Sequence, residues 1–145
     1  MWSYEHSTET TATRAAIWEL WADVGGWPSW NGDIERIRID GPFAAGSTIA
    51  MRPIGQNEVR LRLAEVSENE SFVDEAEIDG LVIRTTHRIG PAGESRVRVS
   101  YCIEITGRGA DELGPQLGPQ ISADFPGTIA ELVRRAEATV PSGGR

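Results

Sequence analysis

The spacing of hydrophobic residues changes twice along the chain. Residues 2–10 alternate in polarity, with Trp2 and His6 on the more apolar side, which predicts a half-buried strand. After a helix cap at Thr11 or Thr13, hydrophobic residues recur every three or four positions, as in a helix with one buried stripe. The proline of the Trp-Pro-Ser-Trp segment that follows suits the first turn of another helix. Two short helices are therefore predicted after the first strand.

Alternation returns at Ile34 and predicts a series of strands. They are expected at 34–40, 47–53, 58–66, 71–78, 81–89 and 95–106. Turn residues separate them, and Asp79-Gly80 is the strongest signal, because a two-residue type I′ turn requires positive φ at both central positions. Strands joined by such short turns form an antiparallel meander.

Helical spacing resumes after Gly109. It predicts one long C-terminal helix over 111–139. Pro119 and Pro126 lie within this helix, and each removes a backbone donor and clashes with the preceding turn. The helix is therefore expected to bend at 122–127.

Length and composition fit one small domain that needs neither a disulfide nor a structural metal. The chain has 145 residues, and we expect a single domain over 1–140 and a disordered tail over 141–145. A lone Cys102 cannot form an internal disulfide, and no apolar run approaches the roughly 18 residues of a membrane span. The first residues also lack the pattern of a signal peptide. A cytoplasmic protein, either monomeric or dimeric, is therefore expected.

The charged residues exclude several kinds of chemistry. All 14 basic residues are arginine, so neither a Schiff-base lysine nor a lysine-containing phosphate loop is available. The net charge is -8, and the arginines of the strand region alternate with apolar residues among a larger number of carboxylates. This pattern is typical of a solvated sheet face with ion pairs. No nucleic-acid partner is expected.

Three local segments, together with the order of the elements, resemble a known superfamily. They are Thr-Arg-Ala-Ala-Ile-Trp-Glu-Leu-Trp at 13–21, Trp-Pro-Ser-Trp-Asn at 27–31 and Ile-Ala-Glu-Leu at 129–132, leading to Ala136 and Glu137. In this order the chain resembles the helix-grip proteins of the START and birch-pollen-allergen superfamily (SRPBCC), and in particular the polyketide cyclase/dehydrase-like branch. The resemblance implies an α+β fold in which a seven-stranded curved antiparallel sheet wraps around a long C-terminal helix. It also implies a deep cavity for lipids, steroids, aromatic polyketides or plant hormones.

Pairing across the Asp-Gly turn indicates which side chains face this cavity. It places Phe72 opposite His87, and it places Asp74 opposite Thr85, on the face that carries the apolar residues. The parity of the next strand adds Tyr101 to this face. The residues expected to contact a ligand are Trp27, Trp30, Phe72, Asp74, Thr85, His87, Val99, Tyr101, Phe125 and Ile129.

The polar and aromatic members of this set allow two interpretations each. His87 and Asp74 form either an acid/base pair, in which the carboxylate orients the imidazole and raises its pKa, or a structural pair inside the core. Tyr101 binds a ligand oxygen or a backbone partner. Trp27 and Trp30 either stack on a flat ligand or fix a helix to the sheet. No metal or cofactor is expected, because the two histidines lack a ligand spacing such as HxxxH.

The leading hypothesis is a carrier or receptor for a small hydrophobic, ring-containing molecule, which requires a largely dry cavity of more than about 300 Å³. The alternative is an enzyme that resembles polyketide aromatase/cyclases. The resemblance would give that enzyme a cavity arginine, but the strand arginines fall on the outer face, and only Arg52 has ambiguous parity. A second alternative is a protein-interaction module of the co-chaperone type, which would expose an apolar patch.

Overall fold

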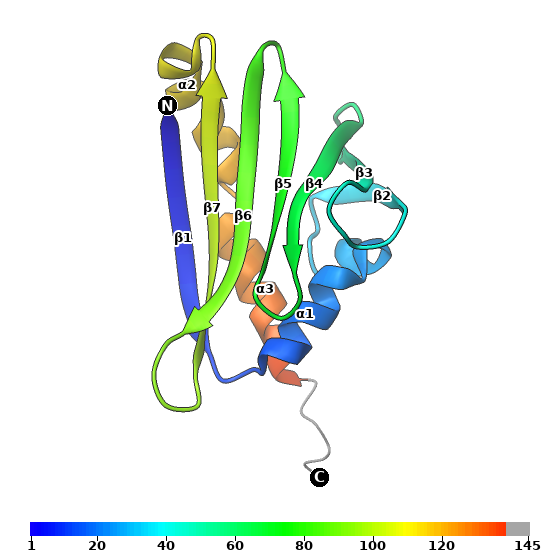
Figure 1. Ribbon diagram of the computed structural model, residues 1–145, viewed down its shortest axis with the longest axis vertical. Helices are drawn as coiled ribbons and strands as arrows, with labels where there is room; N and C mark the ends of the chain where they lie inside the picture. Colours follow the sequence, from blue (N-terminus) through cyan, green and yellow to red (C-terminus); the bar gives the residue numbers. More distant parts are fainter. Residues whose placement is uncertain (139–145) are drawn as a thin grey trace.

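The computed structural model describes residues 1–138, so the predicted helix end at Thr139 and the predicted tail at 141–145 lie outside the described residues. In chain order the elements are β1 (Trp2–Thr10), α1 (Arg14–Ala22), the 3-10 helix η1 (Val24–Ser29), β2 (Ile34–Asp40), β3 (Thr48–Pro53), β4 (Val59–Ser67), β5 (Ser71–Ile78), β6 (Leu81–Pro91), β7 (Val97–Gly107), α2 (Ala110–Ser122) and α3 (Phe125–Ala138). This order confirms the predicted succession of elements, from the first strand to the final helix (Figure 1).

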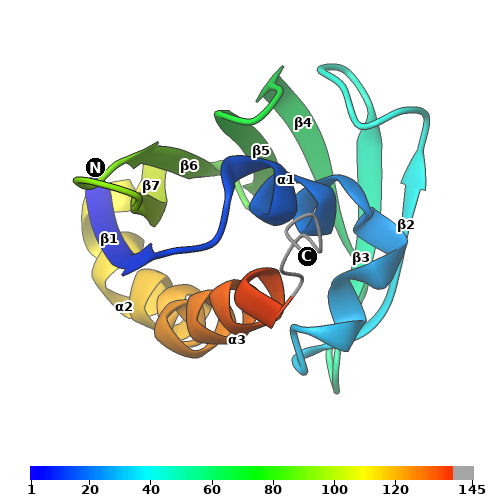
Figure 2. The ribbon, with the colours of Figure 1, turned by 90° about the horizontal axis from the view of Figure 1, so that it is seen from below.

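All seven strands form one antiparallel sheet in the order β1-β7-β6-β5-β4-β3-β2. Strands β2 to β7 follow one another as neighbours, and β1 pairs with β7 at the other end of the sheet, with Trp2 opposite Ile105. The sheet is strongly curved, and α3 runs along its concave side (Figure 2). The predicted helix-grip architecture, a curved sheet around a C-terminal helix, is therefore confirmed.

The turn between β5 and β6 fixes the register that positions the functional side chains. Asp79 and Gly80 have φ values of 52° and 84°, the left-handed conformation that a type I′ turn requires. The strands then pair with Phe72 opposite His87, as the sequence predicted. A shift of one residue would have moved all these side chains to the outer face.

A capping side chain and a proline account for where two of the helices begin. Thr13, one of the two predicted caps, accepts a hydrogen bond from the backbone N–H of Ala16 at 3.0 Å and starts α1. The C-terminal helix is interrupted between α2 and α3, within the segment that was predicted to bend. Pro126 lies in the first turn of α3. Backbone N–H groups in a first turn have no acceptor within the helix, so a proline at this position costs no helical hydrogen bond. No helix among residues 1–138 is long and apolar enough to cross a membrane, and a cytoplasmic location stays a prediction.

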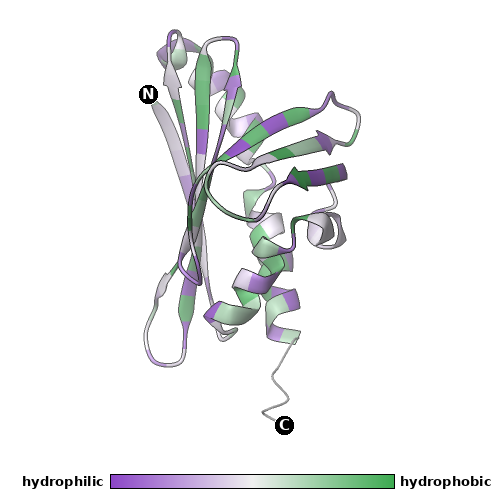
Figure 3. Cartoon of the chain, turned by 45° about the vertical axis from the view of Figure 1, so that its right-hand side comes forward, coloured by the Kyte–Doolittle hydropathy of each residue, from purple (hydrophilic) through white to green (hydrophobic). Residues whose placement is uncertain are grey.

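The core lies between the concave face of the sheet and helices α1 and α3. Hydrophobic and hydrophilic residues alternate along the strands (Figure 3), and most of the buried strand residues are apolar. Trp21, Leu63 and Ile103 are fully buried in this layer. Helix α2 packs closely against β1, because Gly118 lies directly over the indole of Trp2, where a Cβ atom would be only 2.3 Å from a ring carbon.

Candidate functional site

A cavity of about 610 Å³ lies between the sheet, η1 and the junction of α2 and α3. It exceeds the roughly 300 Å³ that a small-molecule site requires. The residues that line it are Trp27, Trp30, Asn31, Asp33, Ile34, Met51, Pro53, Ile54, Gln56, Val59, Leu61, Phe72, Asp74, Ala76, Ile78, Ile83, Thr85, His87, Tyr101, Leu117, Gln120, Ile121, Ala123, Asp124, Phe125 and Thr128. The exposed members, such as Ile54 and Gln56, mark its opening to solvent, and the buried members of β5, β6 and β7 form its floor.

Aromatic rings form part of the wall, and of the two roles that the sequence allowed for the tryptophans the structure shows the one that supports the fold. Trp27 and Trp30 line the cavity with their ring centroids 6.1 Å apart. The indole N–H of Trp27 also donates to the backbone carbonyl of Trp21 at 2.9 Å, which ties η1 to α1. Trp27 therefore supports the fold, and the stacking of either tryptophan on a flat ligand stays a prediction.

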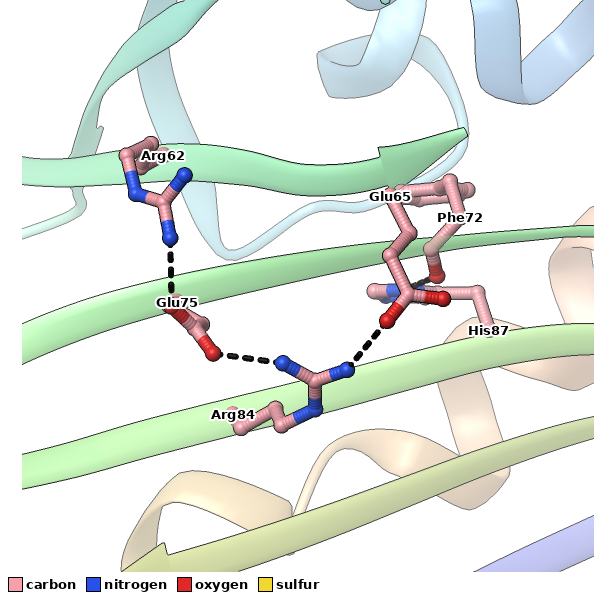
Figure 4. Close-up of polar contacts among 6 residues, drawn as sticks. All are labelled: Arg62, Glu65, Phe72, Glu75, Arg84 and His87. Carbon is pink, nitrogen blue, oxygen red and sulfur yellow. Dashed lines mark hydrogen bonds and ion pairs between the residues drawn. The ribbon is translucent and has the colours of Figure 1, made fainter. Parts of the chain in front are cut away.

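The floor holds a histidine whose tautomer is fixed by the backbone. His87 Nδ1 lies 3.3 Å from the carbonyl oxygen of Phe72, and the two rings stack with their centroids 3.9 Å apart (Figure 4). Because a carbonyl only accepts hydrogen bonds, Nδ1 carries the proton, and Nε2 presents a lone pair. That nitrogen lies 3.8 Å from Asp74 Oδ2, beyond hydrogen-bond distance.

Burial keeps His87 uncharged at neutral pH and keeps Asp74 uncharged below about pH 7. It raises the pKa of Asp74 from 3.8 to about 7, and the negative charge of Glu75 adds to this effect. Burial also lowers the pKa of His87 from 6.5 to about 3. The prediction that Asp74 would raise the histidine pKa and fix its tautomer is wrong, because desolvation outweighs the carboxylate and the Phe72 carbonyl selects the tautomer.

Tyr101 occupies the floor beside the histidine. Its hydroxyl oxygen accepts a hydrogen bond from the indole N–H of Trp21 at 3.1 Å, and its ring lies 4.5 Å from that of His87, edge to face. Burial raises the pKa of the tyrosine, so the hydroxyl keeps its proton. No acceptor among residues 1–138 bonds the hydroxyl proton of Tyr101. This proton is available for a hydrogen bond to a group in the cavity.

Most of the predicted ligand contacts lie in the cavity wall, but two do not. Eight of the ten predicted residues line the cavity, whereas Val99 and Ile129 are both fully buried in the core away from it. Val99 has the expected parity but pairs with Ile89, near the end of the sheet. Strand parity gives the face of a residue, and it does not say which part of that face the helices cover.

Sequence reasoning missed two carboxyl groups near the opening. Asp33 follows η1, and Asp124 lies at the junction of α2 and α3. Burial, and then the nearby Asp33 carboxyl, raise the pKa of Asp124, whose carboxylate is also hydrogen bonded to the hydroxyl of Thr128 at 3.4 Å. An acidic residue before the first turn of α3 resembles a helix cap, which is the one signal that could have identified Asp124.

The arginines among residues 1–138 lie outside the cavity. Arg84 bonds to Glu75 at 2.5 Å and to Glu65 at 2.7 Å on the convex face of the sheet, and Arg62 joins the same network (Figure 4). These guanidinium groups hold the pKa of Glu75 below its usual value. Arg52, whose parity was ambiguous, pairs with Glu35 at 3.8 Å and does not line the cavity. In the described part of the chain, no three His, Cys, Asp or Glu side chains are grouped as a metal site.

Comparison with solved structures identifies the fold. No family model and no curated protein matches the sequence. Norcoclaurine synthase from Thalictrum flavum, solved with dopamine and hydroxybenzaldehyde, is 15% identical and matches with a TM-score of 0.77 over 97% of this chain and 89% of that chain. A START superfamily protein from Mycobacterium smegmatis is 16% identical, with a TM-score of 0.73 over 95% of this chain and 99% of that one. The chain has the helix-grip fold of these proteins.

Helix-grip proteins of different kinds share this likeness. The di-domain aromatase/cyclase StfQ from the steffimycin biosynthetic pathway is 12% identical, with a TM-score of 0.76, and this chain covers 94% of its own length but 50% of StfQ. At these identities the likeness establishes the helix-grip fold alone. The ligand and any reaction must therefore be argued from the cavity.

Proposed function

We propose that this helix-grip protein binds a small, ring-containing hydrophobic molecule in its cavity. The observation that carries the proposal is a cavity of about 610 Å³ with aromatic walls and a few polar groups on its floor. Such a combination is typical of small-molecule sites, where apolar surface provides affinity and a few polar groups orient the ligand. The neighbours of this fold that were solved with ring-containing compounds support the same class of ligand.

The proposed orientation uses the three floor residues. Below about pH 7 the protonated Asp74 carboxyl and the Tyr101 hydroxyl each have a proton to donate, and His87 Nε2 has a lone pair to accept one. A hydroxyl or carbonyl group on the ligand would satisfy these groups. Trp27, with Phe72 at a centroid distance of 6.0 Å, would contact its ring.

Two matched variants test the proposal. Thr85 lines the cavity, whereas its neighbour Thr86 lies on the opposite face of β6. Thr85→Phe should fill part of the cavity and weaken the binding of multi-ring compounds at least about tenfold, whereas Thr86→Phe should not change it. Binding is measured by calorimetry and by tryptophan emission across a panel of hydrophobic compounds. If no compound binds saturably, or if both variants bind alike, the cavity is not the site.

A second candidate is an enzyme that transfers protons within the same cavity. The observation in its favour is the pKa of Asp74, about 7, which suits a general acid or base at neutral pH. The absence of arginine from the described wall departs from the cyclase resemblance. In this case Asp74→Asn should reduce the rate about 10²- to 10⁴-fold and leave ligand affinity nearly unchanged. No turnover by the wild type, together with weaker ligand binding by Asp74→Asn, would favour the carrier.

The interaction-module alternative has weaker support. Exposed apolar side chains would have to form a patch apart from the cavity. Of the five large apolar residues that are exposed, Ile54 and Ile78 belong to the cavity wall. Exposed apolar surface is therefore partly explained by the opening of the ligand site.

A further inference from the structure

From the hydrogen-bonding groups at the cavity floor we infer which polar group the ligand carries: a hydroxyl that donates to His87 Nε2 and accepts from Asp74 and Tyr101. This inference rests on the proposed function and narrows it. The ligand is then a ring-containing alcohol or phenol that enters the cavity with its hydroxyl group first. A ketone or an ether of the same shape is disfavoured.

The register of three neighbouring strands brings these polar groups to one part of the wall. His87 on β6 lies opposite Phe72 of β5 and opposite Tyr101 of β7. Asp74 is two residues from Phe72 along β5, so it shares the same face of the sheet. All four residues line the cavity. The floor therefore combines a carboxyl, an imidazole and a phenol hydroxyl.

The carboxyl group of Asp74 is directed into the cavity. Its side chain is only 9% exposed, and it forms no hydrogen bond with any residue in 1–138. Within that part of the chain, no side-chain N or O atom is fully buried without a partner. The carboxyl oxygens must therefore remain accessible, and the cavity is the space that they face. Few and convergent polar groups of this kind orient the ligand in small-molecule sites.

The spacing of Asp74 and His87 leaves room for one ligand atom between them. Asp74 Oδ2 and His87 Nε2 are 3.8 Å apart, too far for a direct hydrogen bond. A ligand oxygen beside both atoms can lie about 2.8 Å from each of them. Because the Phe72 carbonyl holds the proton on Nδ1, Nε2 can only accept. The ligand group must therefore supply a hydrogen to Nε2.

The other two groups offer protons, and this decides between a hydroxyl and a carbonyl. The Tyr101 hydroxyl accepts from the indole N–H of Trp21, which leaves its own proton for the cavity. Below about pH 7 the Asp74 carboxyl has a second proton to donate. A hydroxyl group accepts both protons and donates its own to His87 Nε2. A carbonyl or an ether oxygen accepts protons but cannot donate, so it would cover Nε2 and leave it unpaired, which is unfavourable.

A matched series of uncharged compounds tests the inference. Naphthol, naphthylmethanol, methoxynaphthalene and acetylnaphthalene, substituted at the same ring position, share one ring system. Calorimetric titration of the full chain at about pH 6 keeps Asp74 protonated. The better of the two hydroxyl compounds should bind about tenfold more tightly than both the ether and the ketone, the effect of one acceptor left unpaired. Comparing the two hydroxyl compounds distinguishes a phenol from an alcohol.

Three variants assign this preference to the floor. His87→Asn keeps an amide near the position of Nδ1 and removes Nε2, so the preference for the hydroxyl compound over the ketone should fall below about threefold. Tyr101→Phe removes a donor that both compounds use, so both should bind more weakly and the preference should remain. His6→Asn removes a histidine of β1 outside the cavity and should change neither affinity.

A second measurement keeps the test decisive if His87→Asn does not fold. The chain has two histidines, so isotope-labelled histidine gives nitrogen signals from two rings in an NMR spectrum, and His6→Asn assigns them. Donation of a hydrogen bond to Nε2 changes the signal of that nitrogen. The hydroxyl compounds should therefore move the Nε2 signal of His87 toward that of a protonated nitrogen, whereas the ketone should not.

The outcomes separate this inference from the proposed function. If none of the four compounds binds and the wider hydrophobic panel fails as well, the proposed function is wrong. If the ketone or the ether binds as tightly as the better hydroxyl compound, the cavity is a ligand site but the inferred hydroxyl is wrong. If the hydroxyl compound is preferred and this preference persists in His87→Asn, or if it leaves the Nε2 signal unchanged, the contact with His87 is rejected.

Discussion

The pH dependence of folding stability tests the charge states at the cavity floor. In the native state Asp74 has a pKa of about 7 and His87 a pKa of about 3, compared with 3.8 and 6.5 for the same groups in solvent. Each shift arises mainly from burial of the residue itself and not from the other member of the pair. Replacing one residue should therefore leave the pKa shift of the other in place.

The two shifts have opposite effects on stability, which cancel in the wild type. Between about pH 4 and pH 6.5 the unfolded chain has an ionised Asp74 and a protonated His87. The native state in this range has a neutral carboxyl and a neutral imidazole. Both states thus bind one proton over the pair, so the pair contributes no pH dependence in this window.

Each single variant should reveal one of the two slopes. In Asp74→Asn only His87 titrates, with a lowered native pKa, so the unfolded chain binds more protons and stability falls as the pH decreases below about 6.5. At about 1.4 kcal/mol per pH unit, the loss reaches about 3 kcal/mol at pH 4. In His87→Gln only Asp74 titrates, with a raised native pKa. Stability is then full below about pH 4 and falls by about 4 kcal/mol as the pH rises to about 7.

Urea unfolding at about pH 4, 5.5 and 7 measures these slopes, with His6→Gln as the control for loss of a histidine. His6 lies on the edge strand β1 and is half-buried. The expected pattern is opposite slopes for the two floor variants and equal slopes for the control and the wild type. If the stability of Asp74→Asn has the same pH dependence as that of the wild type between about pH 4 and pH 6.5, the native imidazole is protonated, and the neutral pair assigned here is wrong.

Three further substitutions test the packing around the cavity, each measured by urea unfolding. Thr13→Ala removes the cap of α1 and should cost about 1 kcal/mol, whereas Thr11→Ala should change stability by less than about 0.5 kcal/mol. Gly118→Ala should destabilise the wild type by about 1 to 2 kcal/mol through contact with Trp2, yet stabilise a Trp2→Ala background by about 1 kcal/mol through helix propensity. Tyr101→Phe removes the acceptor of a buried indole N–H and should cost about 1 to 3 kcal/mol. Equal stability changes for Thr13→Ala and Thr11→Ala, or for Gly118→Ala in the two backgrounds, would contradict the contacts described. So would an unchanged stability of Tyr101→Phe.

The sequence predicted the fold well because its signals are local and agree with one another. Strand β5 occupies Ser71–Ile78, the same bounds as predicted, since alternating polarity defines the strand and an Asp-Gly turn ends it. The same turn determined the register, and with it the inward positions of Phe72, Asp74 and His87. Together with the order of the other elements, these signals are compatible with only a few topologies.

Two properties of the site could not be predicted in this way. The approach of Asp33 to Asp124 brings the turn before β2 to the segment between α2 and α3, and no local pattern encodes such a long-range contact. The pKa of His87 depends on how completely the aromatic rings exclude water from it. From sequence, the nearby carboxylate was the visible influence, so the predicted direction of the shift was wrong.

The polar floor has a cost to the fold, and this cost is an argument for function. Asp74 and His87 are buried residues beside apolar rings, and they do not hydrogen bond to each other at 3.8 Å. Both line the cavity, and no side-chain N or O atom of the described residues is fully buried without a hydrogen-bond partner. Removing such polar groups from bulk water is unfavourable compared with burying apolar side chains. A core selected only for stability would place apolar side chains there, as it does at Leu63 and Ile103 in the same sheet. The retained polar groups are accounted for if a ligand completes their hydrogen bonds, which is what the proposed function supplies.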